Sequence, residues 1–248
     1  MLPWIQLDTA KIPGGGELRL KQRGTEFSIM LGTNELMNSR LSGSEEALAT
    51  LACARLPAAP TILIGGLGMG FTLRAALGAL GARAQVEVAE LVPAVIAWAR
   101  GPMAALFAGC LEDPRVRLIE ADVASLIACG PARYDAILLD VDNGPEGLTV
   151  PANDRLYDAA GLAAARAALR PGGVLAVWSQ GPDRAFTARL RQAGFKVETH
   201  VVRAHRGRAG ARHVVWLATN RPDSASTGPQ LPGHRFARGR GLPLDPGR

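Results

Sequence analysis

Apolar runs of strand length alternate with amphipathic segments through the middle of the chain. The apolar residues gather in segments 61–64, 86–89, 116–122, 134–140 and, after a turn, 170–178. These runs are rich in Val, Ile, Leu and Ala, as is typical of strands that are buried on both faces. The intervening segments predict helices near residues 70–81, 92–109, 154–169 and 183–193. Strands and helices that alternate in this way predict an α/β fold with a mostly parallel, Rossmann-like sheet.

An antiparallel unit precedes this alternation. Short alternating stretches within residues 17–40, separated by glycines, predict a small β-meander. Ser42-Gly43-Ser44-Glu45 then fits a capping box, in which the serine and glutamate side chains bond the first free backbone N–H groups of a helix. We therefore expect a helix over residues 44–56 that leads into the first parallel strand.

The pattern changes again after the last predicted helix. Residues 195–202 and 212–218 are two strands with no helix between them, which predicts an antiparallel hairpin at the edge of the sheet. From residue 221 on, Ser, Gly, Pro and Arg dominate without periodicity. The expected organisation is an N-terminal meander over 1–43, a main domain over 44–220 and a disordered tail over 221–248.

The first apolar run leads directly into a glycine-rich turn. Its glycines are Gly65, Gly66, Gly68 and Gly70. Glu90 follows twenty residues after Gly70, at the end of the next apolar run. Glycines allow a sharp turn and let a ligand approach the backbone, and a carboxylate at the tip of the next strand can accept both hydroxyls of a ribose. The combination predicts a nucleotide-type binding site.

The glycine spacing distinguishes two kinds of ligand. Dinucleotide sites read Gly-x-Gly-x-x-Gly and hold a pyrophosphate at the helix N-terminus. Here the glycines at 66, 68 and 70 are two residues apart, as in proteins that bind S-adenosylmethionine (SAM), which has no phosphate. Asp122 and Asp140 end the third and fourth strands, at the edge where such sheets bind ligands. Asp122 is also suited to cap the following helix, so both roles stay open for it.

Composition and charge argue against several other classes. No apolar run approaches the ~20 residues that span a bilayer, and the N-terminus lacks a basic segment followed by an apolar one. Cys53, Cys110 and Cys129 form no metal-binding pattern, so we expect reduced thiols and no metal. Half of the net charge of +6 lies in residues 221–248, which disfavours nucleic-acid binding. We expect a cytoplasmic protein that binds neither nucleic acid nor membrane.

Residues 17–220 resemble the spermidine synthases, which have a methyltransferase-type fold. The resemblance rests on the meander and helix, the glycine loop, the strand-end acids, and Asp140-Val141-Asp142-Asn143-Gly144-Pro145, where those enzymes have an Asp-x-x-Asp-Pro segment. It implies that Glu90 holds the ribose, that Asp122 with Val123 contacts the adenine, and that Asp140 faces the reacting amine. It also implies a homodimer, because the meander is exposed.

The chain departs from the family pattern at three places. Gly68 stands where spermidine synthases have an aspartate that contacts the amine end of decarboxylated SAM. Their two polyamine-positioning tyrosines are missing, because residues 43–46 read Gly-Ser-Glu-Glu and residues 203–208 read Arg-Ala-His-Arg-Gly-Arg. Since Gly68 leaves room for the methionine end of intact SAM, we predict a SAM-dependent transferase that methylates a small-molecule acceptor. Two alternatives stay open: aminopropyl transfer from decarboxylated SAM to a polyamine, and a non-catalytic nucleoside-binding protein.

These patterns define the candidate site. Asp140 is the candidate catalytic residue, because a carboxylate at the reaction centre can accept an amine proton or bind a cationic acceptor. Asp142, Asn143 and Trp178 are candidate acceptor-binding residues. The basic loop 203–212 either recognises an acidic acceptor or is an ordinary solvated loop. The candidate donor-binding residues are Gly65, Gly66, Gly68, Gly70, Glu90, Leu91, Asp122 and Val123.

Overall fold

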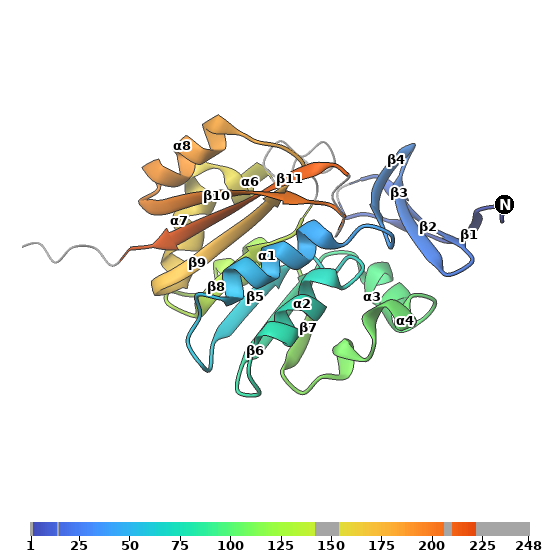
Figure 1. The fold of residues 1–248 in the computed structure, drawn as a ribbon, viewed down its shortest axis with the longest axis horizontal. Coiled ribbons are helices and arrows are strands. Elements are labelled where there is room, and N and C mark those ends of the chain that lie inside the picture. Colours follow the sequence, from blue (N-terminus) through green and yellow to red (C-terminus); the bar gives the residue numbers. More distant parts are fainter. Residues whose placement is uncertain (1, 14, 142–153, 206–209, 222–248) are drawn as a thin grey trace, which may run out of the picture.

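The computed structural model describes residues 2–13, 15–141, 154–205 and 210–221, which form two sheets and their helices (Figure 1). The smaller sheet is antiparallel, with strands in the order β1-β2-β3-β4. The prediction of a meander is confirmed, but it misses the first strand, whose side chains are mostly exposed. Its strands are β1 (Ile5–Lys11), β2 (Glu17–Arg23), β3 (Glu26–Leu31) and β4 (Asn34–Asn38).

The larger sheet has the order β10-β11-β9-β8-β5-β6-β7. Strands β5 to β9 pair in parallel, while β11 pairs antiparallel with β9 and β10 pairs antiparallel with β11. This arrangement confirms the predicted fold, a mostly parallel sheet that closes with an antiparallel hairpin. Its strands are β5 (Thr61–Gly65), β6 (Gln85–Glu90), β7 (Val116–Glu120), β8 (Tyr134–Leu139), β9 (Leu169–Ser179), β10 (Phe195–Arg203) and β11 (Arg212–Asn220).

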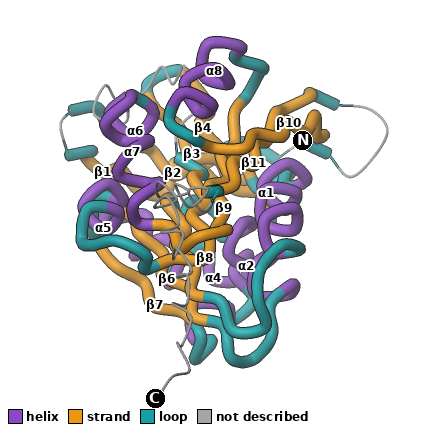
Figure 2. Tube along the Cα trace, turned by 90° about the vertical axis from the view of Figure 1, so that its left-hand side faces the viewer, coloured by secondary structure: helices purple, strands orange, loops and turns teal. Residues whose placement is uncertain are grey.

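Helices cover both faces of the larger sheet, as Figure 2 shows. Ile62 and Ile64 of β5 join the core beneath α1, α2 and α3, whereas Leu63 joins the core beneath α5, α7 and α8. This alternation explains why the strand reads as an unbroken apolar run. The helices are α1 (Gly43–Cys53), α2 (Phe71–Ala79), α3 (Pro93–Arg100), α4 (Ala104–Phe107), the 3₁₀ turn η1 (Cys110–Glu112), α5 (Val123–Ile127), α6 (Asp154–Tyr157), α7 (Ala159–Ala168) and α8 (Arg184–Gln192).

Three helix predictions need correction. The helix expected over 92–109 is interrupted between α3 and α4, where Gly101 ends α3 and Pro102 has no N–H to continue it. The helix expected over 154–169 is divided at Asp158, whose carboxylate accepts a hydrogen bond from Gly161 N and caps α7. The capping box at the start of α1 is absent, because Ser42 makes no side-chain cap bond and donates to Glu46 instead.

The smaller sheet packs against the edge of the larger one where the glycine turn lies (Figure 1). Leu18, Leu20 and Ile29 are buried in the same cluster as Leu48 of α1. Trp98 Nε1 of α3 donates to Asp8 Oδ2 of β1 over 2.6 Å, which ties the first strand to the main body. The N-terminal sheet therefore forms part of the wall around the predicted site.

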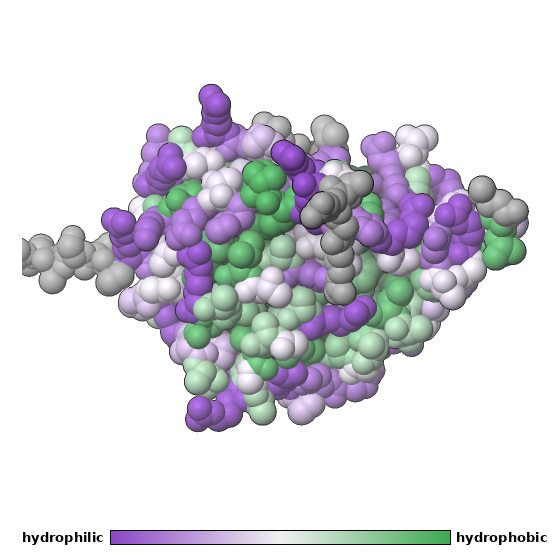
Figure 3. All heavy atoms as spheres, in the orientation of Figure 1, coloured by the Kyte–Doolittle hydropathy of each residue, from purple (hydrophilic) through white to green (hydrophobic). Residues whose placement is uncertain are grey.

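Polar and apolar side chains are unevenly distributed over the face seen in Figure 3. Hydrophilic residues gather over α8 and the N-terminal sheet, while apolar residues are more frequent over α1 and α2. Within the described ranges, no helix combines the length and apolarity that crossing a bilayer requires. Cys53 and Cys110 are buried free thiols and Cys129 is an exposed one.

Candidate active site

The glycine turn brings the ends of three neighbouring strands together. Gly66 N donates to Ala89 O of β6 over 2.9 Å, and Asp140 N donates to Gly65 O over 3.0 Å. Gly66 has φ +91°, and a Cβ there would lie 2.4 Å from the carbonyl oxygen of Asp140. Only glycine fits this approach, so the turn fixes Asp140 next to the start of α2.

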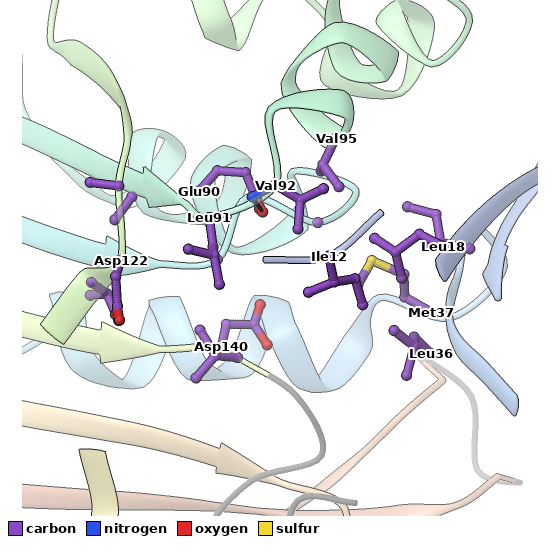
Figure 4. A pocket seen from close by; sticks show the side chains of 17 residues that line it. Ile12, Leu18, Leu36, Met37, Glu90, Leu91, Val92, Val95, Asp122 and Asp140 are labelled. Atoms are coloured by element: carbon purple, nitrogen blue, oxygen red, sulfur yellow. Dashed lines mark hydrogen bonds between the residues drawn. The ribbon is translucent and has the colours of Figure 1, made fainter. Parts of the chain in front are cut away.

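A cavity opens between this turn and the N-terminal sheet (Figure 4). The main domain contributes the strand-end acids, and the sheet contributes an apolar wall. Asp140 projects into the middle of the cavity from below, while Asp122 lies at its far left. We call it the first cavity; it is lined by Ile12, Leu18, Ile29, Leu36, Met37, Gly66, Gly68, Ala89, Glu90, Leu91, Val92, Val95, Ala121, Asp122, Val123, Asp140 and Val141.

Glu90 is 8% exposed and held by the backbone around it. Its Oε2 accepts from Leu67 N over 3.0 Å and its Oε1 accepts from Val92 N over 2.9 Å. Burial raises the pKa of this carboxyl, and the surrounding backbone N–H groups partly oppose the rise. Each carboxylate oxygen keeps a second lone pair, so Glu90 can still accept the hydroxyls of a ribose. That role stays a prediction.

Asp122 caps a helix and also lines the cavity. Its Oδ1 accepts from Ala124 N over 2.8 Å, which satisfies the N-terminus of α5. The structure therefore shows the capping role, while contact with an adenine stays a prediction. Leu91 and Val123 line the same cavity. Val123 packs closely against Gly65, since a Cβ added to Gly65 would lie 2.9 Å from Val123 Cγ2.

A second cavity shares the Asp140 end of the first. Asp140, Gly68, Leu36 and Met37 line both. Thr72 Oγ1, in the first turn of α2, donates to Asp140 Oδ2 over 2.5 Å. The second cavity is lined by Leu36, Met37, Asn38, Glu45, Leu67, Gly68, Met69, Phe71, Asp140 and Trp178.

Glu45 is a site residue that sequence reasoning missed. The sequence predicts that its carboxyl belongs to a capping box, but Ser44 Oγ donates to Glu45 Oε2 over 2.7 Å and the side chain lines the second cavity. Burial, followed by repulsion from Glu45, raises the pKa of Asp140 to about 7. Burial also raises the pKa of Glu45. In the described part of the chain, no Lys or Arg forms an ion pair with either carboxyl.

The predicted acceptor residues are only partly described. Trp178, at the end of β9, is 9% exposed and lines the second cavity, and its contact with an acceptor stays a prediction. Its Nε1 has no hydrogen-bond partner among the described residues, and its ring meets the ring of His213 edge-on at 4.8 Å. Asp142 and Asn143 lie outside the described residues, as does the middle of the basic loop 203–212.

Among the described residues lining the two cavities, the charged side chains are all acidic: Glu45, Glu90, Asp122 and Asp140. A buried carboxylate is costly unless a hydrogen-bond donor or a cation compensates it. Backbone N–H groups do so for Glu90 and Asp122. Asp140 and Glu45 have hydroxyl partners, and no cation among the described residues pairs with them. This electrostatic arrangement favours a cationic ligand at the junction of the cavities.

Curated relatives share part of the chain. A polyamine aminopropyltransferase of Mycobacterium tuberculosis is 35% identical over 153 residues, which are 58% of this chain and 28% of the relative. Polyamine aminopropyltransferase 2 of Pseudomonas aeruginosa is 31% identical over 138 residues, which are 52% of this chain and 37% of the relative. The match therefore spans well under half of each relative. No protein-family model matches the chain.

Solved structures share the fold over most of the chain. Spermidine synthase from Thermotoga maritima superposes with a TM-score of 0.70 at 18% identity, covering 87% of this chain and 72% of that one. TrmN from Thermus thermophilus reaches a TM-score of 0.50 at 27% identity, covering 71% of this chain and 47% of that one. The first of these likenesses concerns the fold alone, but it agrees with the curated relatives. The chain therefore has the methyltransferase-type fold of spermidine synthase and is similar in sequence, over about half of its length, to polyamine aminopropyltransferases.

Proposed function

We propose that the protein transfers an aminopropyl group from decarboxylated SAM to a small amine. The observation that carries this proposal is the pair of carboxyls, Asp140 and Glu45, at the junction of the two cavities without an ion-pair partner in the described residues. An ammonium group is the natural partner for such a pair, and its charge would offset the repulsion between the carboxyls. The curated relatives, named polyamine aminopropyltransferases, support the same proposal.

The charge of the cavities also bears on the donor. Both donors carry a sulfonium and an ammonium, and intact SAM carries a carboxylate in addition. Because the charged residues that line the cavities are acids in the described part of the chain, they repel this carboxylate and favour the more positive decarboxylated donor. The prediction of methyl transfer rested on free space at Gly68, but a Cβ there would lie 3.1 Å from Met37 Sδ, so Met37 already occupies much of that space.

The proposed chemistry needs alignment more than activation. The sulfonium is a good leaving group, so the site must place the amine nitrogen behind the carbon that is attacked and keep the nitrogen unprotonated. Asp140 lies at the shared end of both cavities, between the proposed donor and acceptor positions. With its pKa near 7, its carboxyl can take up a proton at neutral pH.

Methyl transfer from SAM to an amine remains the second candidate. Gly68 favours it, because the loop lacks the acid that spermidine synthases have there. The two candidates share the amine acceptor and differ in the donor and its product.

Product analysis distinguishes these reactions. The protein is incubated with SAM or decarboxylated SAM and with putrescine, cadaverine or spermidine, and the nucleoside product is identified by mass spectrometry. We expect 5′-methylthioadenosine from decarboxylated SAM, and in calorimetry at least ~10-fold tighter binding of that donor than of SAM. S-adenosylhomocysteine as the main product, with tighter binding of SAM, would overturn the proposal in favour of methyl transfer.

A further inference from the structure

A line of hydrogen bonds leads away from the second cavity through α1 to β11. Ser44 Oγ donates to Glu45 Oε2 over 2.7 Å, and His213 Nδ1 lies 2.9 Å from the same Ser44 oxygen. A serine hydroxyl has one proton, so when that proton goes to Glu45 the imidazole Nδ1–H must donate to Ser44. Ser44 is fully buried, whereas His213 is partly exposed. The line therefore joins a carboxyl in the cavity to a ring near the surface.

The inner end of this line meets Asp140. Thr72 Oγ1 donates to Asp140 Oδ2 over 2.5 Å and lies 3.4 Å from the carbonyl oxygen of Glu45, so it bridges β8 and α1. Burial and the charge of Glu45 raise the pKa of Asp140 to about 7, and burial raises the pKa of Glu45 as well. Near neutral pH the two carboxyls together can therefore hold a proton.

The outer end of the line is His213, whose pKa is lowered, whereas the pKa values of Asp140 and Glu45 are raised. Burial lowers the pKa of His213, so its ring is neutral at pH 7 and can accept a proton. The edge of Trp178 packs against this ring and holds its orientation. Among the residues that the structure describes, the charged neighbours of the line are Glu46 on α1, Asp140 after β8, Arg203 on β10 and Arg212 on β11.

We propose that Glu45, Ser44 and His213 form a proton relay that removes the proton an acceptor ammonium must lose before its nitrogen attacks the donor. The inference rests on the proposed function, since it assumes an amine acceptor in the second cavity. It assigns Ser44 and His213 as positioning residues that act through Glu45 and do not touch the substrate.

The steps balance in atoms and charge. The ammonium gives one proton to the Glu45 carboxylate and becomes a neutral amine. The amine lone pair forms the new N–C bond, while the C–S bond breaks and its electron pair stays on sulfur, so that the sulfonium becomes a neutral thioether and the positive charge passes to the new secondary ammonium. The neutral ring of His213 exchanges its proton between Nδ1 and Nε2 through solvent, and in the Nε2–H tautomer Nδ1 is free to accept. Glu45 then donates its proton to the Ser44 oxygen, the Ser44 proton passes to Nδ1, and Nε2 releases its proton to solvent, which restores the Nδ1–H donor to Ser44.

Kinetics as a function of pH test the relay. Ser44→Ala removes the linking hydroxyl, and His213→Asn keeps an amide group near the Nδ1 position but cannot carry the proton. For both variants we expect kcat to fall about tenfold at pH 7 with KM for the amine nearly unchanged. The loss should shrink toward pH 9.5, where more of the amine is already neutral. His200→Asn on β10 is the matched control, because His200 pairs with Glu198 away from the cavity.

Two kinetic results would overturn the relay. One is an equal loss at every pH, which would mean that the line only supports the fold. The other is full activity of His213→Asn, which would mean that hydrogen bonding without proton transfer suffices.

A second measurement does not depend on turnover. NMR titration of the His213 ring is compared between the wild-type protein and Glu45→Gln. If the two groups are linked through Ser44, loss of the carboxylate lowers the pKa of His213 by about half a unit or more. An unchanged pKa would overturn the relay whatever the enzyme does. If the wild-type protein transfers no aminopropyl group to any amine while the titration still shows the link, the proposed function fails and the hydrogen-bonded line itself stands.

Discussion

The two cavities differ in how the protein compensates their acids. In the first cavity, Glu90 accepts hydrogen bonds from two backbone N–H groups and Asp122 accepts one as a helix cap. At the shared end with the second cavity, Asp140 and Glu45 repel each other and receive hydroxyl hydrogen bonds. The difference teaches that the acids of the first cavity lie apart and are compensated by backbone donors, whereas the two acids at the junction repel each other and would be stabilised by a bound cation.

The largest expected effect is the loss of turnover in Asp140→Asn. The variant keeps the size of the side chain but removes the negative charge that would hold the acceptor nitrogen beside Glu45, so turnover of decarboxylated SAM with an amine should fall by ~10²–10⁴-fold. Donor affinity, measured by calorimetry, should change little. Glu120→Gln is the control, because Glu120 ends the neighbouring part of the sheet on β7 but is exposed and lines neither cavity. If the variant instead binds the donor more weakly with no selective loss of rate, Asp140 is a donor-binding residue and not a catalytic one.

Glu90→Ala should give the next largest effect. It removes the acceptor of Leu67 N and Val92 N and the expected partner of the ribose, so we expect at least ~10-fold weaker donor binding together with a lower melting temperature. Glu90→Gln keeps one oxygen acceptor and should be intermediate in both measurements. Less than about threefold loss of affinity in the alanine variant would remove Glu90 from the donor site.

The sequence predicts the order of elements well, because buried parallel strands are unambiguous apolar runs. The first strand of the smaller sheet escapes prediction, because its residues Ile5–Lys11 are held by backbone pairing with β2 and not by burial. The break between α3 and α4 was readable at Gly101-Pro102, but the apolar pattern on both sides concealed it.

The donor-side acids were predictable for a related reason, since each follows a strand end at a fixed place in the fold. Glu45 was not, although a signal for it existed. It lies three and four residues before Leu48 and Ala49, which form the buried face of α1. The same spacing places Glu45 on that face, whereas the capping-box interpretation turned it toward the helix end. The contact of Ser44 with His213 joins positions 169 residues apart and required the folded structure.

A smaller effect concerns stability and pH. Burial raises the pKa of Asp140 to about 7 in the folded protein, against about 4 in an unfolded chain. Below pH ~4 both states hold the proton and the contribution to stability is complete; as the pH rises through 7 the folded state must ionise and that contribution is lost. Asp140→Asn avoids this loss, so at pH 8 it should be more stable than the wild type by about 1–2 kcal/mol, or roughly 3–6 °C.

Calorimetric melting at pH 5 and pH 8 checks this prediction. The advantage of Asp140→Asn should be larger at pH 8 than at pH 5, while Glu120→Gln should show no such change. An Asn variant that is less stable at pH 8 would mean that the ionised carboxyl is compensated within the protein, as Glu90 is.

The smallest effect should come from Asp122→Ala. Loss of the cap on α5 should cost about 1 kcal/mol, or ~2–4 °C in melting temperature. Asp158→Ala is the matched control, because Asp158 caps α7 in the same way but lines neither cavity. If Asp122 also contacts the adenine, only its variant loses donor affinity. Equal affinity in the two variants would leave Asp122 with its capping role alone.

Because the N-terminal sheet forms one wall of the first cavity, a bound ligand should stabilise the packing of this sheet against the main domain. Ile12, Leu18 and Met37 lie on one side of that cavity, and Glu90 and Asp122 on the other. A molecule held between them binds only when both sides are assembled, so its binding free energy adds to the free energy that keeps the sheet docked. Local opening of β1 to β4 would then become rarer as ligand concentration rises, and amide hydrogen exchange in these strands would report the occupancy of a site to which they supply no charged group.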